Sequence, residues 1–443
     1  MVGYLISLAI FISTYALFSL GLNLQWGYTG LINFGHIAFM TLGAYTTVLL
    51  SLNGVPMLVA ALLGALLAAF LGLLIGLSTL RLREDYLAIV TIGVSEVIRL
   101  IALNEEELTK GTRGVYGYPL PLAQLEPNML VKFGMSAVVT GIFGIGLWKL
   151  WCWLTQLPRL QPQGSDLQAL PDQPERSPKF GSRHTLLFGG YVGCLGLLVV
   201  SLWLSFSVNL GFLAFGVVPL GIGAGLPYLQ RSQPIQQFKA QPWTIHLSLV
   251  AATLTLGFVL MIYWAGITQI WDYTYKGGLL WILIVTVALV FWRLEALVNS
   301  PWGRVLKAIR EDEEVAKALG KNVFRYKLQS LMIGGAIAGL AGAFYAWQLT
   351  FINPDGFIPL ITFQAWIIVV LGGSGNNVGT LLGAMIFWAY DAVTRLVLPS
   401  LLPFDDARLG AFRIMVIGLL MIVIMMWRPQ GILGKKDELT LSR

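Results

Sequence analysis

The stretch VPMLVAALLGALLAAFLGLLIGLSTL, residues 55–80, contains no charged side chain. It exceeds the length of about 20 residues that a helix needs to cross the hydrocarbon core of a bilayer. Comparable apolar runs lie at 2–23, 185–207 and 277–297. Of the 443 residues, 56% are hydrophobic and 12% are charged, whereas an ordinary soluble domain carries about 25% charged residues. The composition therefore predicts an integral membrane protein and argues against a water-soluble fold.

Apolar windows between charges and turn residues divide the chain into candidate spans. These lie at 2–23, 29–50, 55–80, 86–103, 130–154, 185–207, 209–229, 244–265, 278–298, 328–350, 361–373, 377–398 and 409–427. We expect an all-α, polytopic integral membrane protein with roughly 10–13 transmembrane helices in a single domain, residues 1–443. The run 361–373 falls below the spanning length, so whether it crosses the membrane or re-enters stays open.

Basic residues predict the orientation, because cytoplasmic loops of membrane proteins carry an excess of Lys and Arg. The densest basic loop is 300–327, and the C-terminal tail carries three more basic residues at 428–436. We expect both segments in the cytoplasm, separated by four crossings. Counting back six spans places the arginines of 81–83 on the same side and the N-terminus outside. The net charge of +7 fits this orientation and contact with anionic lipid, and no soluble stretch has the basic and aromatic pattern of a nucleic-acid interface.

One stretch interrupts the apolar pattern. Residues 156–183 read QLPRLQPQGSDLQALPDQPERSPKFGSR and are rich in Pro, Gln and charge. Such a segment cannot bury enough apolar area to offset the entropy lost on ordering, so we expect a flexible loop exposed to solvent.

The segment WGRVLKAIREDEEVAKALGKN, residues 302–322, is charged and amphipathic. Its apolar residues recur at helical spacing on one side and are interrupted by Asp312; they are Val305, Ala308, Ile309, Val315, Ala316 and Leu319. Glu313 and Lys317 form a favourable i,i+4 pair. Such a helix could lie on the membrane surface or fit its apolar ridge into a groove of a partner protein. Periodicity alone does not decide between the two.

Residues 314–320, EVAKALG, follow the E-A-A-x-x-x-G pattern of the cytoplasmic signature of permeases in ATP-binding-cassette importers, with Val in the second place. Neighbouring motifs extend the likeness: GYTGLINFGHIAFMTLGAY at 27–45, LREDYLAIVTIGVSEVIRL at 82–100, the stretch 303–346, VVLGGSGNNVGTLLGA at 369–384 and MMWRPQGIL at 425–433. Together they resemble a LivM-type permease of importers for branched-chain and hydrophobic amino acids. The likeness leaves out 147–263, which we interpret as a family-atypical insertion, either a decoration or a regulatory or assembly contact.

The resemblance implies a multi-pass protein of the bacterial inner membrane with three kinds of partner. These are a second permease of LivH type, two ATPase subunits, and an extracytoplasmic amino-acid-binding protein. It also implies that 300–327 is the segment that couples to the ATPase, through Arg304, Arg310, Glu311, Asp312, Glu314, Ala316 and Gly320. The sequence contains no Walker motif and no cluster of metal-ligating residues. We therefore expect no enzyme activity and no bound cofactor in this chain, with ATP and Mg²⁺ used by the partner ATPase.

Charged and polar residues at membrane depth are candidates for the translocation path, because burying them in lipid is costly. Glu96 and Arg99 stand three residues apart on one predicted helix and could either neutralise each other or meet the two charges of an amino acid. Asn33 and His36 lie in the run 29–50, where a lone His is a packing residue or a ligand.

Glycine-rich stretches give two further expectations. The run 372–379, GGSGNNVG, lacks the Lys of a phosphate-binding loop, so Gly372, Gly373 and Ser374 form either a simple turn or part of the path. The glycines within 334–342 have the spacing of close helix packing.

The sequence thus predicts the permease subunit of an importer for branched-chain or other neutral hydrophobic amino acids. Two alternatives stay open. One is a related importer for urea or short amides. The other is an independent ion-coupled transporter, which predicts internal repeats and an acidic residue at mid-membrane.

Overall fold

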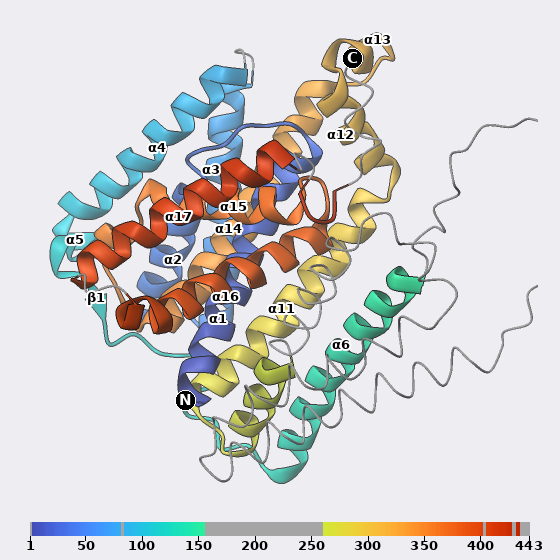
Figure 1. Ribbon diagram of the computed structural model, residues 1–443. Coiled ribbons are helices and arrows are strands. Elements are labelled where there is room, and N and C mark those ends of the chain that lie inside the picture. Colours follow the sequence, from blue (N-terminus) through green and yellow to red (C-terminus); the bar gives the residue numbers. More distant parts are fainter. Residues whose placement is uncertain (1, 81–83, 156–259, 402–404, 428–430, 435–443) are drawn as a thin grey trace, which may run out of the picture. The chain divides into compact units, whose positions relative to one another are not determined.

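The computed structural model describes residues 2–80, 84–155, 260–401, 405–427 and 431–434 (Figure 1). The chain divides into two units, one formed by Met1–Leu147 and Ile262–Arg443 and the other by Trp148–Met261. The second unit is described only at 148–155 and 260–261, and both stretches are helical. The predicted loop 156–183 lies outside the described residues, as does most of the predicted insertion 147–263.

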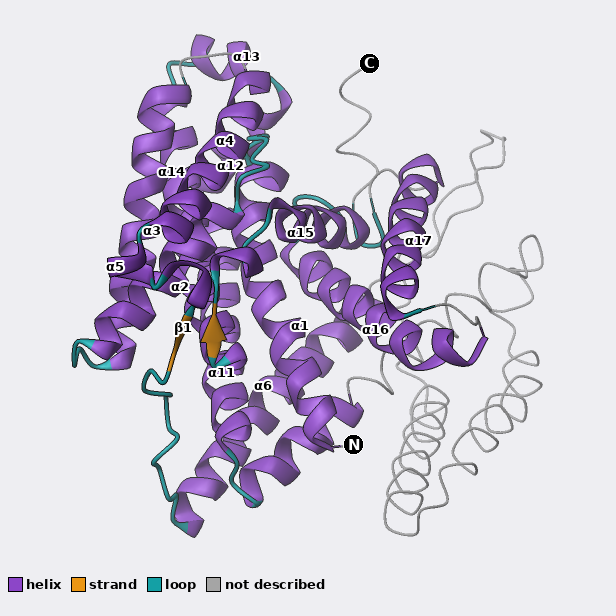
Figure 2. Cartoon of the chain, turned by 90° about the vertical axis from the view of Figure 1, so that its left-hand side faces the viewer, coloured by secondary structure: helices purple, strands orange, loops and turns teal. Residues whose placement is uncertain are grey.

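Helices dominate the described residues (Figure 2). The α-helices are α1 (Val2–Leu22), α2 (Ile37–Leu52), α3 (Met57–Thr79), α4 (Glu84–Asn104), α5 (Glu106–Thr109), α6 (Met129–Thr155), α11 (Tyr275–Val298), α12 (Pro301–Glu311), α13 (Glu313–Ala318), α14 (Val323–Leu349), α15 (Pro359–Gly372), α16 (Asn377–Leu401) and α17 (Asp406–Trp427). A π-helical turn η1 (Asn23–Tyr28) and two 3-10 turns, η2 (Gly111–Arg113) and η3 (Pro354–Gly356), supplement them. Two short strands, β1 (Val115–Tyr116) and β2 (Phe351–Ile352), pair antiparallel with Val115 opposite Ile352.

The predicted all-α polytopic membrane fold is confirmed. Within the described residues, seven helices are long and apolar enough to cross a membrane, and α2 is a shorter apolar helix. The predicted spans 185–207 and 209–229 lie outside the described residues, so the total of 10–13 stays a prediction.

The predicted span 29–50 is wrong in its first part. Residues 29–36 are not helical, and α2 begins at Ile37. The chain comes close to α4 here, since a Cβ on Gly35 would lie 1.8 Å from the carbonyl oxygen of Thr91. Glycine at position 35 is therefore what lets the two segments meet.

Small residues hold α2, α3 and α14 together, and these three helices pack against one another. A Cβ on Gly43 of α2 would lie 2.0 Å from the carbonyl oxygen of Gly339 on α14, and one on Gly342 would lie 2.0 Å from that of Met40. On α3, a Cβ at Gly72 would lie 3.0 Å from the Leu331 carbonyl oxygen. The predicted close packing by the glycines of 334–342 is therefore what the structure has.

The helices run between two ends of this bundle. At one end lie α12 and α13, next to the start of α14, and we call it the coupling end (Figure 1). At the other end the Lys276 ammonium donates to the Ser7 hydroxyl over 2.9 Å, so α1 and α11 start together. The helix α3 finishes at the coupling end, where a Cβ on Gly76 would meet the Leu328 side chain at 2.4 Å.

The run 361–373 is α15, whose 14 residues span about 21 Å. Just before it, Asp355 lies 3.3 Å from Arg99, at the end opposite the coupling end. After it, Gly375 approaches Gly27 and Arg310 at the coupling end. The helix therefore passes from one end of the bundle to the other.

Gly43→Ala is predicted to lower the free energy of unfolding by about 1–3 kcal/mol, because its methyl group would overlap the Gly339 carbonyl and push α2 from α14. Thermal unfolding of the purified protein in detergent measures this. Gly93→Ala is the matched control, since a Cβ there has no neighbour within 4 Å. Equal melting temperatures for the two variants would contradict the packing.

Candidate coupling site and polar junction

The coupling segment consists of two helices, whereas the sequence favoured one. Asp312 separates α12 from α13 and is extended, with φ −156° and ψ 109°. Its carboxylate accepts the backbone N–H groups of Glu314 at 2.9 Å and Val315 at 3.0 Å. Asp312 is therefore the N-cap of α13, a role worth about 1 kcal/mol.

The far end of α13 is closed by Gly320, whose φ is +73°. The N–H of Lys321 donates to the carbonyl of Ala316, and the N–H of Gly320 donates to that of Lys317. This pair of bonds is the Schellman arrangement, in which glycine supplies the left-handed residue. The backbone conformation at the end of α13 thus explains why the E-A-A-x-x-x-G pattern ends in glycine.

The break at Asp312 also divides the apolar ridge that the periodicity predicted. Ile309, Ala316 and Val323 form a buried cluster, whereas Val315 is 54% exposed and Leu319 is 70% exposed. The outer surface of α13 is therefore an apolar pair with charges around it, and we call it the α13 face, defined by Glu314, Val315, Ala318, Leu319 and Gly320.

The predicted coupling residues separate by exposure. Five of them are exposed: Arg304, Glu311, Asp312, Glu314 and Gly320. Ala316 is buried on the inner side of α13. Arg310 is half-buried and points away from the α13 face.

Glu313 attaches α13 to α14. Its carboxylate lies 2.6 Å from the buried Lys327 ammonium and 3.2 Å from that of Lys317, so the predicted Glu313–Lys317 pair forms. Burial acts to raise the pKa of Glu313, but the hydrogen bonds and charges of the two lysines outweigh it and hold the pKa below its ordinary value. The carboxylate is thus ionised near neutral pH and fixes α13 in place.

At the coupling end, a polar junction joins segments that are distant in the sequence. We define it as residues 23–30, Arg310 and the loop 372–379. The Arg310 guanidinium on α12 donates to the carbonyl of Gly27 in η1. The amide side chain of Asn23 accepts from the backbone N–H of Gly375 at 2.9 Å.

The amide of Asn23 also donates to the Asn377 side chain over 3.1 Å, and Asn377 donates to the Glu295 carboxylate over 3.1 Å. Asn23, Asn377 and Glu295 are not among the site residues predicted from the sequence. Each is a polar residue inside or beside an apolar run, which was the available signal. Their partners lie on other helices, so the sequence could not give the pairing.

The C-terminal motif packs on the same loop. The N–H groups of Ile432 and Leu433 donate to the carbonyls of Leu371 and Gly372, both over 3.0 Å. The Asn376 amide donates to the Leu433 carbonyl over 2.9 Å. The irregular backbone of this loop is thus hydrogen-bonded within the protein.

The predicted path residues do not form one cluster. Asn33 is fully buried, donates to the Gln25 side chain over 2.9 Å and accepts the Gly35 N–H. His36 is fully buried between Phe18 and Phe39, and its Nε2 lies 3.2 Å from the Phe18 carbonyl oxygen. These contacts favour the packing interpretation of His36.

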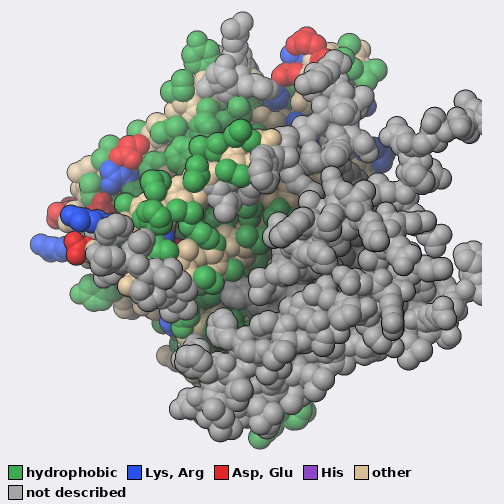
Figure 3. All heavy atoms as spheres, viewed as in Figure 1, with side chains coloured by type: hydrophobic (Ala, Val, Ile, Leu, Met, Phe, Trp, Pro, Cys, Tyr) green, Lys and Arg blue, Asp and Glu red, His purple; other side chains and the backbone are tan. Residues whose placement is uncertain are grey.

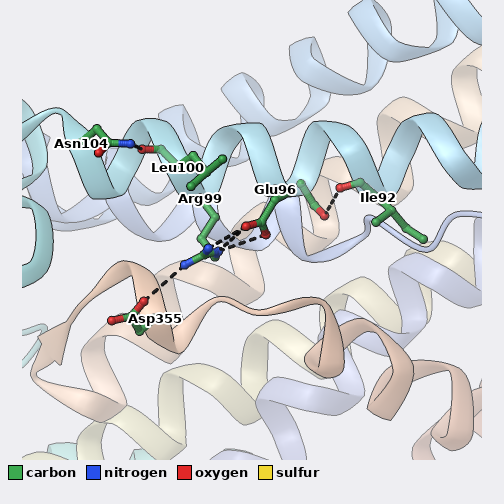
Figure 4. A network of polar contacts seen from close by, with 7 residues as sticks. Ile92, Glu96, Arg99, Leu100, Asn104 and Asp355 are labelled. Carbon is green, nitrogen blue, oxygen red and sulfur yellow. Dashed lines mark hydrogen bonds and ion pairs between the residues drawn. The ribbon is translucent and has the colours of Figure 1, made fainter.

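Glu96 and Arg99 lie on α4 near the opposite end and pair with each other at 2.6 Å (Figure 4). Arg99 also reaches Asp355, over 3.3 Å. Mutual neutralisation is thus the arrangement present. Gly372, Gly373 and Ser374 instead belong to the junction loop, where Gly373 has φ +115°.

The distribution of side chains agrees with a membrane setting. Charged side chains gather at the two ends, around α13 and around α5, and hydrophobic side chains cover much of the described face between them (Figure 3). Exposed large apolar residues of α3 and α17, such as Leu66 and Leu419, supply a surface suited to lipid.

A family model described as "Branched-chain amino acid transport system / permease component" matches residues 4–155 and 176–425. The match omits 156–175, within the predicted polar loop, and includes 176–263, the later part of the predicted insertion. No solved structure matches the chain.

Curated relatives carry related names. The high-affinity branched-chain amino acid transport system permease protein LivM of Salmonella typhimurium is 26% identical over 420 residues, covering 95% of this chain and 67% of that protein. The probable branched-chain amino acid transport permease protein LivM of Methanocaldococcus jannaschii is 31% identical over 173 residues, covering 38% of this chain and 49% of that protein. LivH of Salmonella typhimurium is 30% identical over 139 residues, covering 31% and 41%.

The predicted resemblance to LivM-type permeases is confirmed by these matches. The family match covers most of the chain, and the helices described here have the length and apolarity of a polytopic membrane protein. The chain belongs to the family of permease components of branched-chain amino acid transport systems.

Proposed function

We propose that the chain is the permease subunit of an ATP-binding-cassette importer that carries branched-chain and other neutral hydrophobic amino acids across the bacterial inner membrane. The family and the names of its relatives support the substrate class. The α13 face carries the proposal of ATP coupling, because it is an exposed apolar pair on a short, capped helix outside the spans. An exposed apolar pair of this kind is better accommodated in a groove of a partner protein than in water.

The coupling end then faces the cytoplasm and receives two ATPase subunits, which bind ATP and Mg²⁺. A second permease of LivH type and an extracytoplasmic amino-acid-binding protein complete the importer. ATP binding and hydrolysis change the contacts that the α13 face makes, and the permease responds by shifting between two states. Glu314 lies on this face, and Arg304 and Glu311 are exposed on the preceding helix α12.

An independent ion-coupled transporter is the second candidate, and one observation bears on it. The acidic residue inside α16, Asp391, lies 2.7 Å from Arg395 and 3.9 Å from Arg413 of α17. The two arginines balance the charge of this carboxylate, so it is a poor site for a coupling cation. The ATP-driven importer is therefore the better proposal.

Deleting this subunit is predicted to abolish ATP-dependent uptake of labelled leucine, isoleucine and valine, and a plasmid copy should restore it. Uptake by the deletion strain of a panel that includes urea and short amides defines the substrate class. Loss of urea or amide uptake with normal leucine uptake would contradict the amino-acid assignment.

Glu314→Lys is predicted to reduce uptake to background, because it reverses the charge at the α13 face while the residue is 82% exposed and supports no core. Gly320→Leu should act similarly, since its φ of +73° disfavours any side chain and opens the end of α13. Uptake and membrane-inserted protein are measured together. Glu107→Lys, an exposed charge in α5, is the control, and normal uptake by both α13 variants would contradict docking there.

The position of α13 is predicted to depend on acid pH. Because the pKa of Glu313 is lowered in the folded protein, its stabilisation is present above the ordinary Glu pKa of about 4.3 and is lost as the pH falls below it. The protection factors for hydrogen exchange of residues 313–320, corrected for the intrinsic rate at each pH, should therefore be constant near neutral pH and fall below about pH 4. Glu313→Gln should be unprotected throughout, and protection independent of pH would contradict the role of Glu313.

A further inference from the structure

Arg310 differs from the exposed charges of the coupling segment because it is directed into the bundle. It lies in the last turn of α12, and its guanidinium donates to the carbonyl of Gly27. Gly27 lies in the last turn of η1, where helix carbonyls lack a partner of their own. A guanidinium bonded to such a carbonyl is a charge-assisted hydrogen bond, stronger than an ordinary amide bond.

Three glycines make room for this arginine. A Cβ on Gly375 would lie 2.8 Å from Nη1 of Arg310, and a Cβ on Gly30 would lie 3.4 Å from its Cγ. A Cβ on Gly27 would lie 2.4 Å from the backbone nitrogen of Gly375. Side chains at these positions would displace the arginine or separate the two backbones.

The arginine therefore contacts two backbones that are already joined to each other. Asn23 accepts the Gly375 N–H at 2.9 Å and donates to Asn377 at the start of α16. Arg310 belongs to α12, and the chain continues from α12 through Asp312 into α13. The sequence of contacts thus runs from the α13 face to η1 at the end of the first span and to the loop between α15 and α16.

We propose that Arg310 is an internal tether rather than a contact to the ATPase: it makes α12, residues 23–30 and the loop 372–379 move as one body, so that force on the α13 face reaches the membrane segments. This inference rests on the proposed coupling function. It assigns Arg310 a positioning role, in place of the docking role predicted from the sequence. Arg304 on the same helix is exposed and provides the comparison.

The test uses the complete importer with its binding protein in proteoliposomes, and measures uptake and ATP hydrolysis in the same sample. Arg310→Ala is expected to keep the ATPase activity within about twofold of the unaltered complex while uptake falls about tenfold, which lies within the range for a coupling interaction. Arg304→Ala, if it has an effect, should change hydrolysis and uptake together.

Two outcomes overturn the tether. Uptake by Arg310→Ala at the unaltered ratio to ATP hydrolysed would show that the bond transmits nothing. Parallel loss of hydrolysis and uptake would show that Arg310 contacts the ATPase. If the unaltered complex shows no ATP-dependent uptake, the proposed function fails instead, and the two failures are thereby distinguished.

Discussion

The constraint on which the structure depends is that backbone N–H and C=O groups at membrane depth must find partners within the protein. A continuous helix satisfies it without help, but residues 29–36 and 373–376 are not helical. Their polar groups are met by buried side chains, among them Asn23, Asn33 and Thr29, of which Thr29 shares a 2.7 Å bond with Ser330 of α14. These bonds fix where the first spans, α14 and the α15–α16 loop lie relative to one another.

The same constraint explains why the coupling end is built in two layers. The inner layer is the polar junction, where Arg310 donates to an unsatisfied helix carbonyl and glycines allow backbones to touch. The outer layer is α13, capped by Asp312, closed by Gly320 and held to α14 by Glu313 and Lys327. A short helix with both ends stabilised and an exposed apolar pair transmits force well, because it does not unfold when a partner pushes on it.

Much of this fold could be predicted from the sequence, because long apolar runs have one physical solution in lipid. The predicted run 55–80 became α3 and 278–298 became α11. The break at 29–36 could not be predicted, since the segments it contacts, such as Thr91 against Gly35, come from distant parts of the chain. The apolar ridge of 305–319 was read as one face because periodicity assumes an uninterrupted helix, whereas Asp312 ends α12 and restarts α13 in a new direction. The residue types of the coupling segment were thus visible in the sequence, but which of them face outward was not.

The central claim is that the α13 face contacts the ATPase, and a photo-crosslinking amino acid at position 319 tests it most directly. Leu319 is 70% exposed in the described structure, so the probe replaces no core contact. Tyr116, which is 74% exposed at the opposite end, is the control position. Irradiation of the assembled importer should join the chain to an ATPase subunit from position 319 and not from position 116. An intact complex in which position 319 crosslinks to lipid alone, or to no protein, would contradict the account.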